Sequence, residues 1–122
     1  MQKYRVTFFE TEDGEVPAED FLVKLDKKMR AKMTRAMIAL RGLGPELREP
    51  YSKHLDNGIF ELRARVGSNI SRVLYFFIVG KRAIITHGFI KKTQKTPPSE
   101  INKAKSYRMI FLEREAKSDE NT

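Results

Sequence analysis

Two residue types are missing from this chain of 122 residues, which contains no cysteine and no tryptophan. The absence of cysteine excludes a disulfide-stapled secreted scaffold, a cysteine-based zinc site and a cysteine nucleophile. Histidine is scarce, since His54 and His87 are the only two, and neither has a second histidine or a carboxylate at helical ligand spacing. We therefore expect no metal site.

Long hydrophobic runs and the common glycine motifs are also absent. The longest apolar runs have about the length of a strand, and residues 1–5 lack the apolar stretch of a signal peptide. We therefore expect a cytoplasmic protein that does not bind a membrane. There is no P-loop, no GxGxxG and no GxSxG, so the sequence suggests neither a nucleotide cofactor nor a serine nucleophile.

Positive charge is present in excess and is unevenly distributed. The formal net charge is +8, with 40% hydrophobic and 33% charged residues, a balance typical of a folded domain. Residues 1–50 carry a net charge of +1, residues 51–95 carry +7, and residues 96–122 carry 0. A concentrated excess of this kind creates a local positive potential that attracts polyanions, although a merely solvated basic face is the simpler alternative.

The first half of the chain predicts one strand and a pair of helices. Residues 3–9 have strand composition and precede an acidic turn over residues 10–15. Apolar residues then recur at helical spacing from Pro17 to Gly42. One helix of that length would be about 37 Å long, so we expect a break near Asp26, which would cap the second helix. Lys28, Lys32 and Arg35 form one stripe on this second helix, which we expect to be plainly solvated.

The second half predicts a sheet and a final helix. Residues 59–66 alternate between apolar and charged, residues 70–79 are apolar on both faces, and residues 83–90 form a third strand. A helix restarts at Pro97 and Pro98, and the charged tail 113–122 is expected to fray. We predict one α+β domain over residues 1–112, with an N-terminal strand, an α-hairpin, an antiparallel three-strand meander completing a small sheet, and a C-terminal helix.

Basic side chains gather around the predicted meander. Arg63 and Arg65 project from one face because strand residues two apart share a face, and hairpin pairing should bring Arg72 close to them. The cluster favours phosphate binding. Its members are Lys53, His54, Arg63, Arg65, Arg72, Lys91, Lys92 and Lys95.

Three sequence blocks in a fixed order carry a family resemblance. They are residues 53–63 (KHLDNGIFELR), 72–75 (RVLY) and 87–97 (HGFIKKTQKTP), followed by Glu100, Ile101 and Ala104. In this order and spacing, the chain from Lys3 to about Tyr107 resembles the phage-derived HigB-like branch of the RelE/ParE toxin superfamily. The resemblance implies a RelE-like fold and a type II toxin that enters the ribosomal A site and cleaves translated mRNA. It also implies a cognate antitoxin, expected to be a HigA-like helix-turn-helix protein.

If the protein cleaves RNA without a metal, the basic side chains of the meander have definite roles. The neighbouring 2′-hydroxyl attacks the phosphate, and negative charge develops on the phosphorane and on the leaving 5′ oxygen. Arg63 matches a family position that stabilises this transition state, while Arg72 and Lys53 would clamp the phosphate. The alternative for Arg63 is a structural ion pair with Glu61 or Asp56. Arg65, His54 and the three lysines of residues 91–95 would bind the RNA backbone, or the lysines would serve solubility alone.

The sequence does not identify the residue that transfers protons. The candidates are Tyr75, His54, His87 or a lysine with a lowered pKa. Each has a simpler alternative, since Tyr75 and His87 could be core residues and His54 could be a binding group. Some relatives end the last strand with a histidine–tyrosine pair, whereas residues 89–92 here read Phe-Ile-Lys-Lys. This departure favours a mechanism that depends mainly on electrostatics.

Two other functions also fit the sequence. One is a ParE-like toxin that poisons gyrase by binding it, and the other is a non-catalytic RNA-binding phage accessory module. The density of arginine and lysine on the predicted sheet favours the endoribonuclease over the gyrase-poisoning toxin. Full toxicity of an Arg63→Ala and Arg72→Ala double mutant would instead favour the RNA-binding module.

Overall fold

The fold is given by a computed structural model that describes residues 3–120. It is an α+β fold, as predicted, with a five-strand sheet, two helices in the N-terminal half and a C-terminal helix. The elements in chain order are β1 (Arg5–Phe8), α1 (Pro17–Lys24), α2 (Lys27–Leu43), a short 3₁₀ turn (Gly44–Glu46), β2 (Ser52–Asp56), β3 (Ile59–Val66), β4 (Asn69–Ile78), β5 (Arg82–Lys91) and α3 (Pro98–Glu120).

The sheet has the strand order β1-β5-β4-β3-β2. β1 runs parallel to β5, and all the other neighbours are antiparallel. The predicted meander is therefore present, but β2 adds a fourth antiparallel strand at its edge. The sequence placed Lys53 and His54 before the meander because residues 52–56 show no alternation of apolar and polar side chains. An edge strand pairs on one side only, so it can carry exposed polar residues at successive positions, as Lys53 and His54 do.

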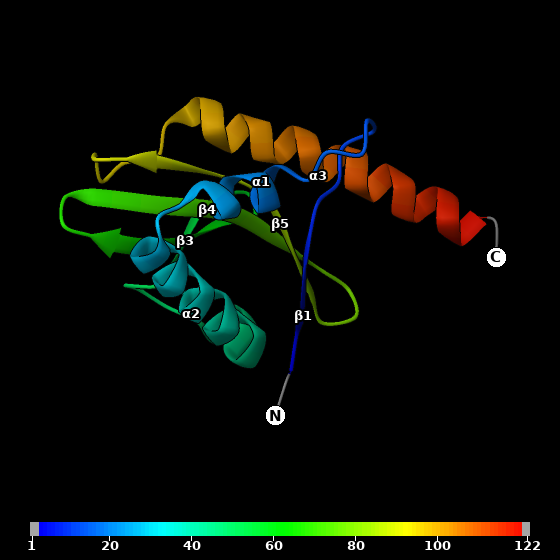
Figure 1. Ribbon diagram of the computed structural model, residues 1–122. Coiled ribbons are helices and arrows are strands. Elements are labelled where there is room, and N and C mark those ends of the chain that lie inside the picture. Colours follow the sequence, from blue (N-terminus) through cyan, green and yellow to red (C-terminus); the bar gives the residue numbers. More distant parts are fainter. Residues whose placement is uncertain (1–2, 121–122) are drawn as a thin grey trace.

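Helices cover the sheet on both faces. Figure 1 shows α3 along one face and α2 on the other. Buried side chains of α1 and α2 pack with Leu62, Val73 and Ile85, whereas Ala104 of α3 packs with Leu74 and Ile84. Because alternate strand residues face opposite sides, β4 is apolar toward both layers, as its sequence predicts.

The break between α1 and α2 lies where the sequence predicts it. Asp26 is the N-cap of α2, and its Oδ1 atom accepts a hydrogen bond from the backbone N–H of Met29 at 2.8 Å. Arg30 donates to the backbone carbonyls of Leu22 at 3.1 Å and Leu25 at 2.7 Å. These contacts fix α2 against the end of α1.

The charged C-terminal segment from residue 113 is part of the last helix, and its expected fraying stays a prediction. α3 runs to Glu120, so the boundary expected at residue 112 falls inside one continuous helix. Glu115 pairs with Arg82 of β5 at 3.0 Å, and Arg114 donates to the carbonyl of Glu10 at 2.6 Å. The first contact joins α3 to β5, and the second joins it to the segment after β1. Figure 1 shows the C-terminal end of α3 extending beyond the sheet. None of the helices within residues 3–120 combines the length and apolar character needed to cross a membrane.

Two glycines should respond to alanine substitution in opposite ways. A Cβ atom on Gly88 of β5 would overlap the ring of Phe21 in α1, whereas a Cβ on Gly42 of α2 would meet no atom within 4 Å. We expect Gly88→Ala to cost about 1–3 kcal/mol of unfolding free energy, because the α1–β5 contact must open. Gly42→Ala should gain about 0.5–1 kcal/mol, because alanine has less conformational entropy than glycine to lose when the chain folds. Urea denaturation of both variants tests the packing, and an unaffected Gly88→Ala variant would contradict it.

Candidate functional site

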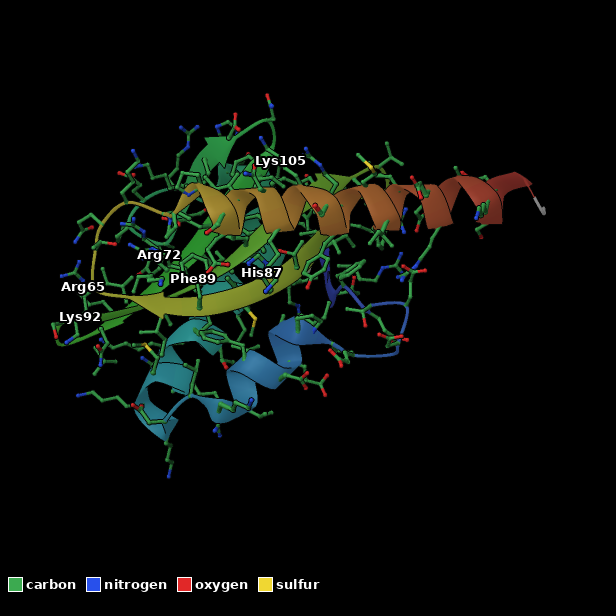
Figure 2. The ribbon with its side chains drawn as sticks, turned by 90° about the horizontal axis from the view of Figure 1, so that it is seen from above. Arg65, Arg72, His87, Phe89, Lys92 and Lys105 are labelled. Carbon is green, nitrogen blue, oxygen red and sulfur yellow. The ribbon has the colours of Figure 1, made fainter. Side chains whose placement is uncertain are left out.

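The arginines of the meander meet at one end of the sheet. Arg63 of β3 lies directly opposite Arg72 of β4, so the predicted proximity of these two side chains is confirmed. In Figure 2, Arg65 and Lys92 lie at the end of the sheet that α3 leaves uncovered, and Arg72, Phe89 and His87 follow one another toward the part beneath α3. This end of the sheet carries a concentrated positive charge.

A buried carboxylate organises the two arginines. Glu61 is fully buried, and its Oε1 atom accepts a hydrogen bond from Nε of Arg63 at 2.5 Å. Its Oε2 atom lies 3.6 Å from Nε of Arg72 and accepts a hydrogen bond from the Thr96 hydroxyl. The ion pair considered as the alternative role of Arg63 is therefore present. It does not remove Arg63 from the surface, since 21% of that side chain is exposed.

Arg72 differs from Arg63 because it is completely buried. Its guanidinium lies 6.0 Å from the centroid of the Phe89 ring and donates to the carbonyl oxygen of Thr93. Its Nε and Nη1 atoms have no hydrogen-bond partner among the described residues. Desolvation lowers the pKa of Arg72, and the charge of Glu61 opposes this effect. A phosphate can therefore reach Arg72 only if the segment around Thr93 moves.

The segment after β5 closes over both arginines. Arg63 donates through Nη1 to the side-chain oxygen of Gln94 at 3.2 Å and through Nη2 to its backbone carbonyl. Thr93 and Thr96 contact Arg72 and Glu61, as described above. No sequence pattern indicated a role for Gln94 or Thr96, and the sequence suggested Glu61 only as a possible partner of Arg63. Strand parity could have identified Glu61, since it lies two residues before Arg63 in β3 and therefore shares a face with it.

Two hollows flank Arg63. The α2 groove, of about 890 Å³, lies between α2 and β3 and includes Lys32, Arg35, Tyr51 and Arg65 in its lining. The β2 hollow, of about 320 Å³, is lined by residues of β2 and β3, the segment 94–96 and Ile101. Lys53, Arg63 and Gln94 line both hollows. Arg63 therefore lies where a ligand in either hollow could contact it.

The other predicted cations, the phosphate clamp Lys53 and the RNA-binding residues, lie in or near these hollows or at the end of β5. Arg65 and Lys53 are exposed, and Lys95 lines the β2 hollow. Lys91 and Lys92 are exposed at the end of β5 and just beyond it. Their predicted contact with RNA stays a prediction.

His54 lines the β2 hollow but is held by local contacts. Its ring packs against Phe60 with 5.0 Å between centroids, and its Nε2 atom accepts a hydrogen bond from the N–H of Gly58 at 3.0 Å. This bond occupies the nitrogen that would otherwise accept a proton in the hollow. The geometry favours His54 as a binding group over His54 as a base.

Tyr75 lies in the core, which was the alternative to a catalytic role. It belongs to the buried cluster beneath α1 and α2, on the face opposite Arg63 and Arg72, and it is hydrogen-bonded to Ser52. Burial raises its pKa to about 12. The structure does not bring its hydroxyl to the arginines, and the raised pKa makes its phenolate form scarcer than that of an exposed tyrosine. The catalytic role expected for Tyr75 is therefore not supported.

His87 is also a packed residue. Its Nε2 atom is hydrogen-bonded to Oε1 of Glu100 at 3.0 Å and its Nδ1 atom to the Thr86 hydroxyl at 3.0 Å. Its ring meets Tyr107 of α3 edge to face, with 5.8 Å between centroids. Burial lowers the pKa of His87, although Glu100 opposes the shift. His87 therefore connects β5 to α3, and its buried position does not support the expected role in proton transfer.

This depressed pKa predicts a pH dependence of stability. The unfolded chain protonates His87 near its ordinary value of 6.5, whereas the folded chain does so only at lower pH. The free energy of unfolding should therefore fall as pH decreases below about 6.5. Urea midpoints measured from about pH 7.5 to about pH 5.5 should show a smaller decline for His87→Gln than for the parent. His54→Gln is the matched control and should retain the parental decline; identical slopes for all three proteins would refute the assignment.

A comparison with protein families identifies the family of this chain. Residues 20–109 match the family model described as Phage derived protein Gp49-like (DUF891), a match that spans well over half of the chain. A search of curated proteins finds no match. The matched family is part of the RelE/HigB toxin-like superfamily and is generally a toxin-like module of toxin–antitoxin systems. The chain therefore belongs to the phage-derived Gp49-like family of the RelE/HigB toxin-like superfamily.

Proposed function

We propose that this protein is the toxin of a type II toxin–antitoxin pair and that it cleaves mRNA in the ribosomal A site. One observation carries the proposal. Arg63 is held by an ion pair with the buried carboxylate of Glu61, and it lines two hollows that Lys53 also lines. A guanidinium held in this way can meet charge that develops on a phosphate without first reorganising.

The proposed reaction is transesterification at the scissile phosphate. The 2′-oxygen forms a bond to phosphorus as the bond to the 5′ oxygen breaks, which leaves a 2′,3′-cyclic phosphate and a free 5′-hydroxyl. Arg63 would stabilise the phosphorane oxygens and Lys53 would neutralise a neighbouring phosphate oxygen. Because Tyr75 and His87 are buried, the mechanism depends mainly on fixed cations. The 2′ proton passes to solvent, and solvent protonates the 5′ oxygen.

A purified translation system tests this function directly. Addition of the protein should produce cuts at codon-linked positions in an mRNA under translation, with no cuts in the same RNA free of ribosomes. Intact transcripts in the translating sample would refute the proposal. A supercoiling assay with purified gyrase serves as the parallel measurement, since inhibition there would instead support the ParE-like function.

The proposed antitoxin is a helix-turn-helix protein with an acidic segment that covers the basic end of the sheet. The net charge of +7 on residues 51–95 supports this partner. Co-expression with the adjacent open reading frame should restore growth and yield a co-purified complex. The absence of both effects would exclude that reading frame as the antitoxin.

A further inference from the structure

The α2 groove joins elements that are far apart in the sequence. Its walls come from α2, from the segment 49–51 and Lys53 of β2, and from β3, with Ile70 of β4 and Gln94 completing the lining. Lys32 of α2 donates to the backbone carbonyl of Arg65 at 2.9 Å, so one edge of the groove is tied across the helix and the strand. Lys32 therefore does more than face solvent, whereas Lys28 and Arg35 are exposed, as the sequence suggested.

The lining of the groove is strongly cationic. Five of its side chains are basic, against the single carboxylate of Glu49: Lys32, Arg35, Lys53, Arg63 and Arg65. Within the described residues, Arg35, Lys53 and Arg65 form no ion pair with an acidic side chain of this chain. Such a set of cations can neutralise several phosphates along one strand.

An aromatic ring stands among these cations. Tyr51 is 52% exposed, although it is a large side chain, and it lines the groove. Its backbone carbonyl accepts a hydrogen bond from the N–H of Arg63 at 2.9 Å, which fixes the position of Tyr51 relative to the candidate cleavage site. Exposed aromatic rings between cations are the usual platform for the bases of single-stranded nucleic acid.

We propose that the α2 groove binds the single-stranded RNA next to the cleaved phosphate, with one base stacked on Tyr51 and phosphates on Arg35 and Arg65. This inference rests on the proposed function, because Arg63 belongs to both surfaces. An RNA strand passing from the β2 hollow into the groove would cross Arg63 at the point where the two hollows meet. The combination of an exposed ring with unpaired cations favours RNA over an acidic protein segment, which would need the cations but not the ring.

The test uses a fluorescent 2′-O-methyl RNA of about eight nucleotides, which cannot be cleaved because its 2′-oxygens are blocked. Binding to the full chain is followed by anisotropy at several salt concentrations. Tyr51→Ala should weaken binding about 5- to 100-fold, and Tyr51→Phe should restore it. Arg35→Ala and Arg65→Ala should each reduce the salt slope by about 0.7. Lys28→Ala, on α2 but outside the groove, is the matched control and should bind as the parent does.

The outcomes separate this inference from the proposed function. Parental binding by Tyr51→Ala and Arg35→Ala would overturn the groove assignment, even if translation-dependent cleavage is found. If the variants bind RNA normally but lose the antitoxin complex, the groove accepts a protein segment and the inference is again overturned. The remaining outcome is that the variants lose RNA binding while the parent protein makes no cuts in the translation system. The groove assignment then stands and the proposed cleavage fails.

Discussion

Arg63→Ala is expected to lower the rate of mRNA cleavage by about 100- to 1,000-fold, the usual cost of removing one fixed donor from a transition-state site. Arg63 is the arginine that combines a buried anchor, Glu61 at 2.5 Å, with access to both hollows. Arg72 shares the anchor but is buried under Thr93. The measurement is the rate at which cut fragments accumulate in the translation system.

Two further variants make this result specific. Arg63→Lys keeps the charge but loses the planar fork, so it should recover only part of the lost rate. Arg5→Ala removes an exposed arginine from β1, at the opposite edge of the sheet, and should cleave at the parental rate. Urea denaturation must show that Arg63→Ala is folded under the assay conditions. A folded Arg63→Ala variant with parental cleavage would remove Arg63 from the reaction.

Most of the fold follows from short-range sequence patterns. The period of two over residues 59–66, the break at Asp26 and the apolar run of β4 each reflect local rules, and each appears in the structure. β2 could not be predicted in this way, because its polar edge residues acquire strand structure only by pairing with β3. The helical end of α3 likewise depends on long-range contacts of Arg114 and Glu115.

In the site, too, the sequence pattern predicts which residues are neighbours, whereas their burial depends on tertiary packing. Strand parity and hairpin pairing correctly placed Arg63 beside Arg72. Parity alone cannot distinguish an exposed arginine from a buried one, because burial is decided by the segment 93–96 that folds over the sheet. For this reason Arg72 was expected to be an open phosphate clamp and is instead enclosed, and Gln94 was not expected to contact Arg63 at all.

Glu61→Gln should cause the largest loss of stability of any single substitution considered for this protein, about 3–5 kcal/mol of unfolding free energy. The carboxylate is completely buried and faces two guanidinium groups, one of which, on Arg72, is also completely buried. Glutamine keeps the size of the side chain but removes its charge, and its amide N–H groups would point toward donors. The charge of Arg72 would then be left without compensation in the interior. Urea unfolding at neutral pH measures the loss.

A double-mutant cycle distinguishes loss of charge compensation from a simple packing defect. Arg72→Met removes the buried guanidinium, so Glu61→Gln combined with Arg72→Met should recover most of the stability lost in Glu61→Gln alone. Glu115→Gln is the matched control, because it breaks a more exposed ion pair, with Arg82, and should leave the urea midpoint nearly unchanged. If the two losses at Glu61 and Arg72 simply add, Glu61 does not compensate Arg72. Its role would then be to hold the segment around Thr96 and Arg63, the arginine that faces the hollows.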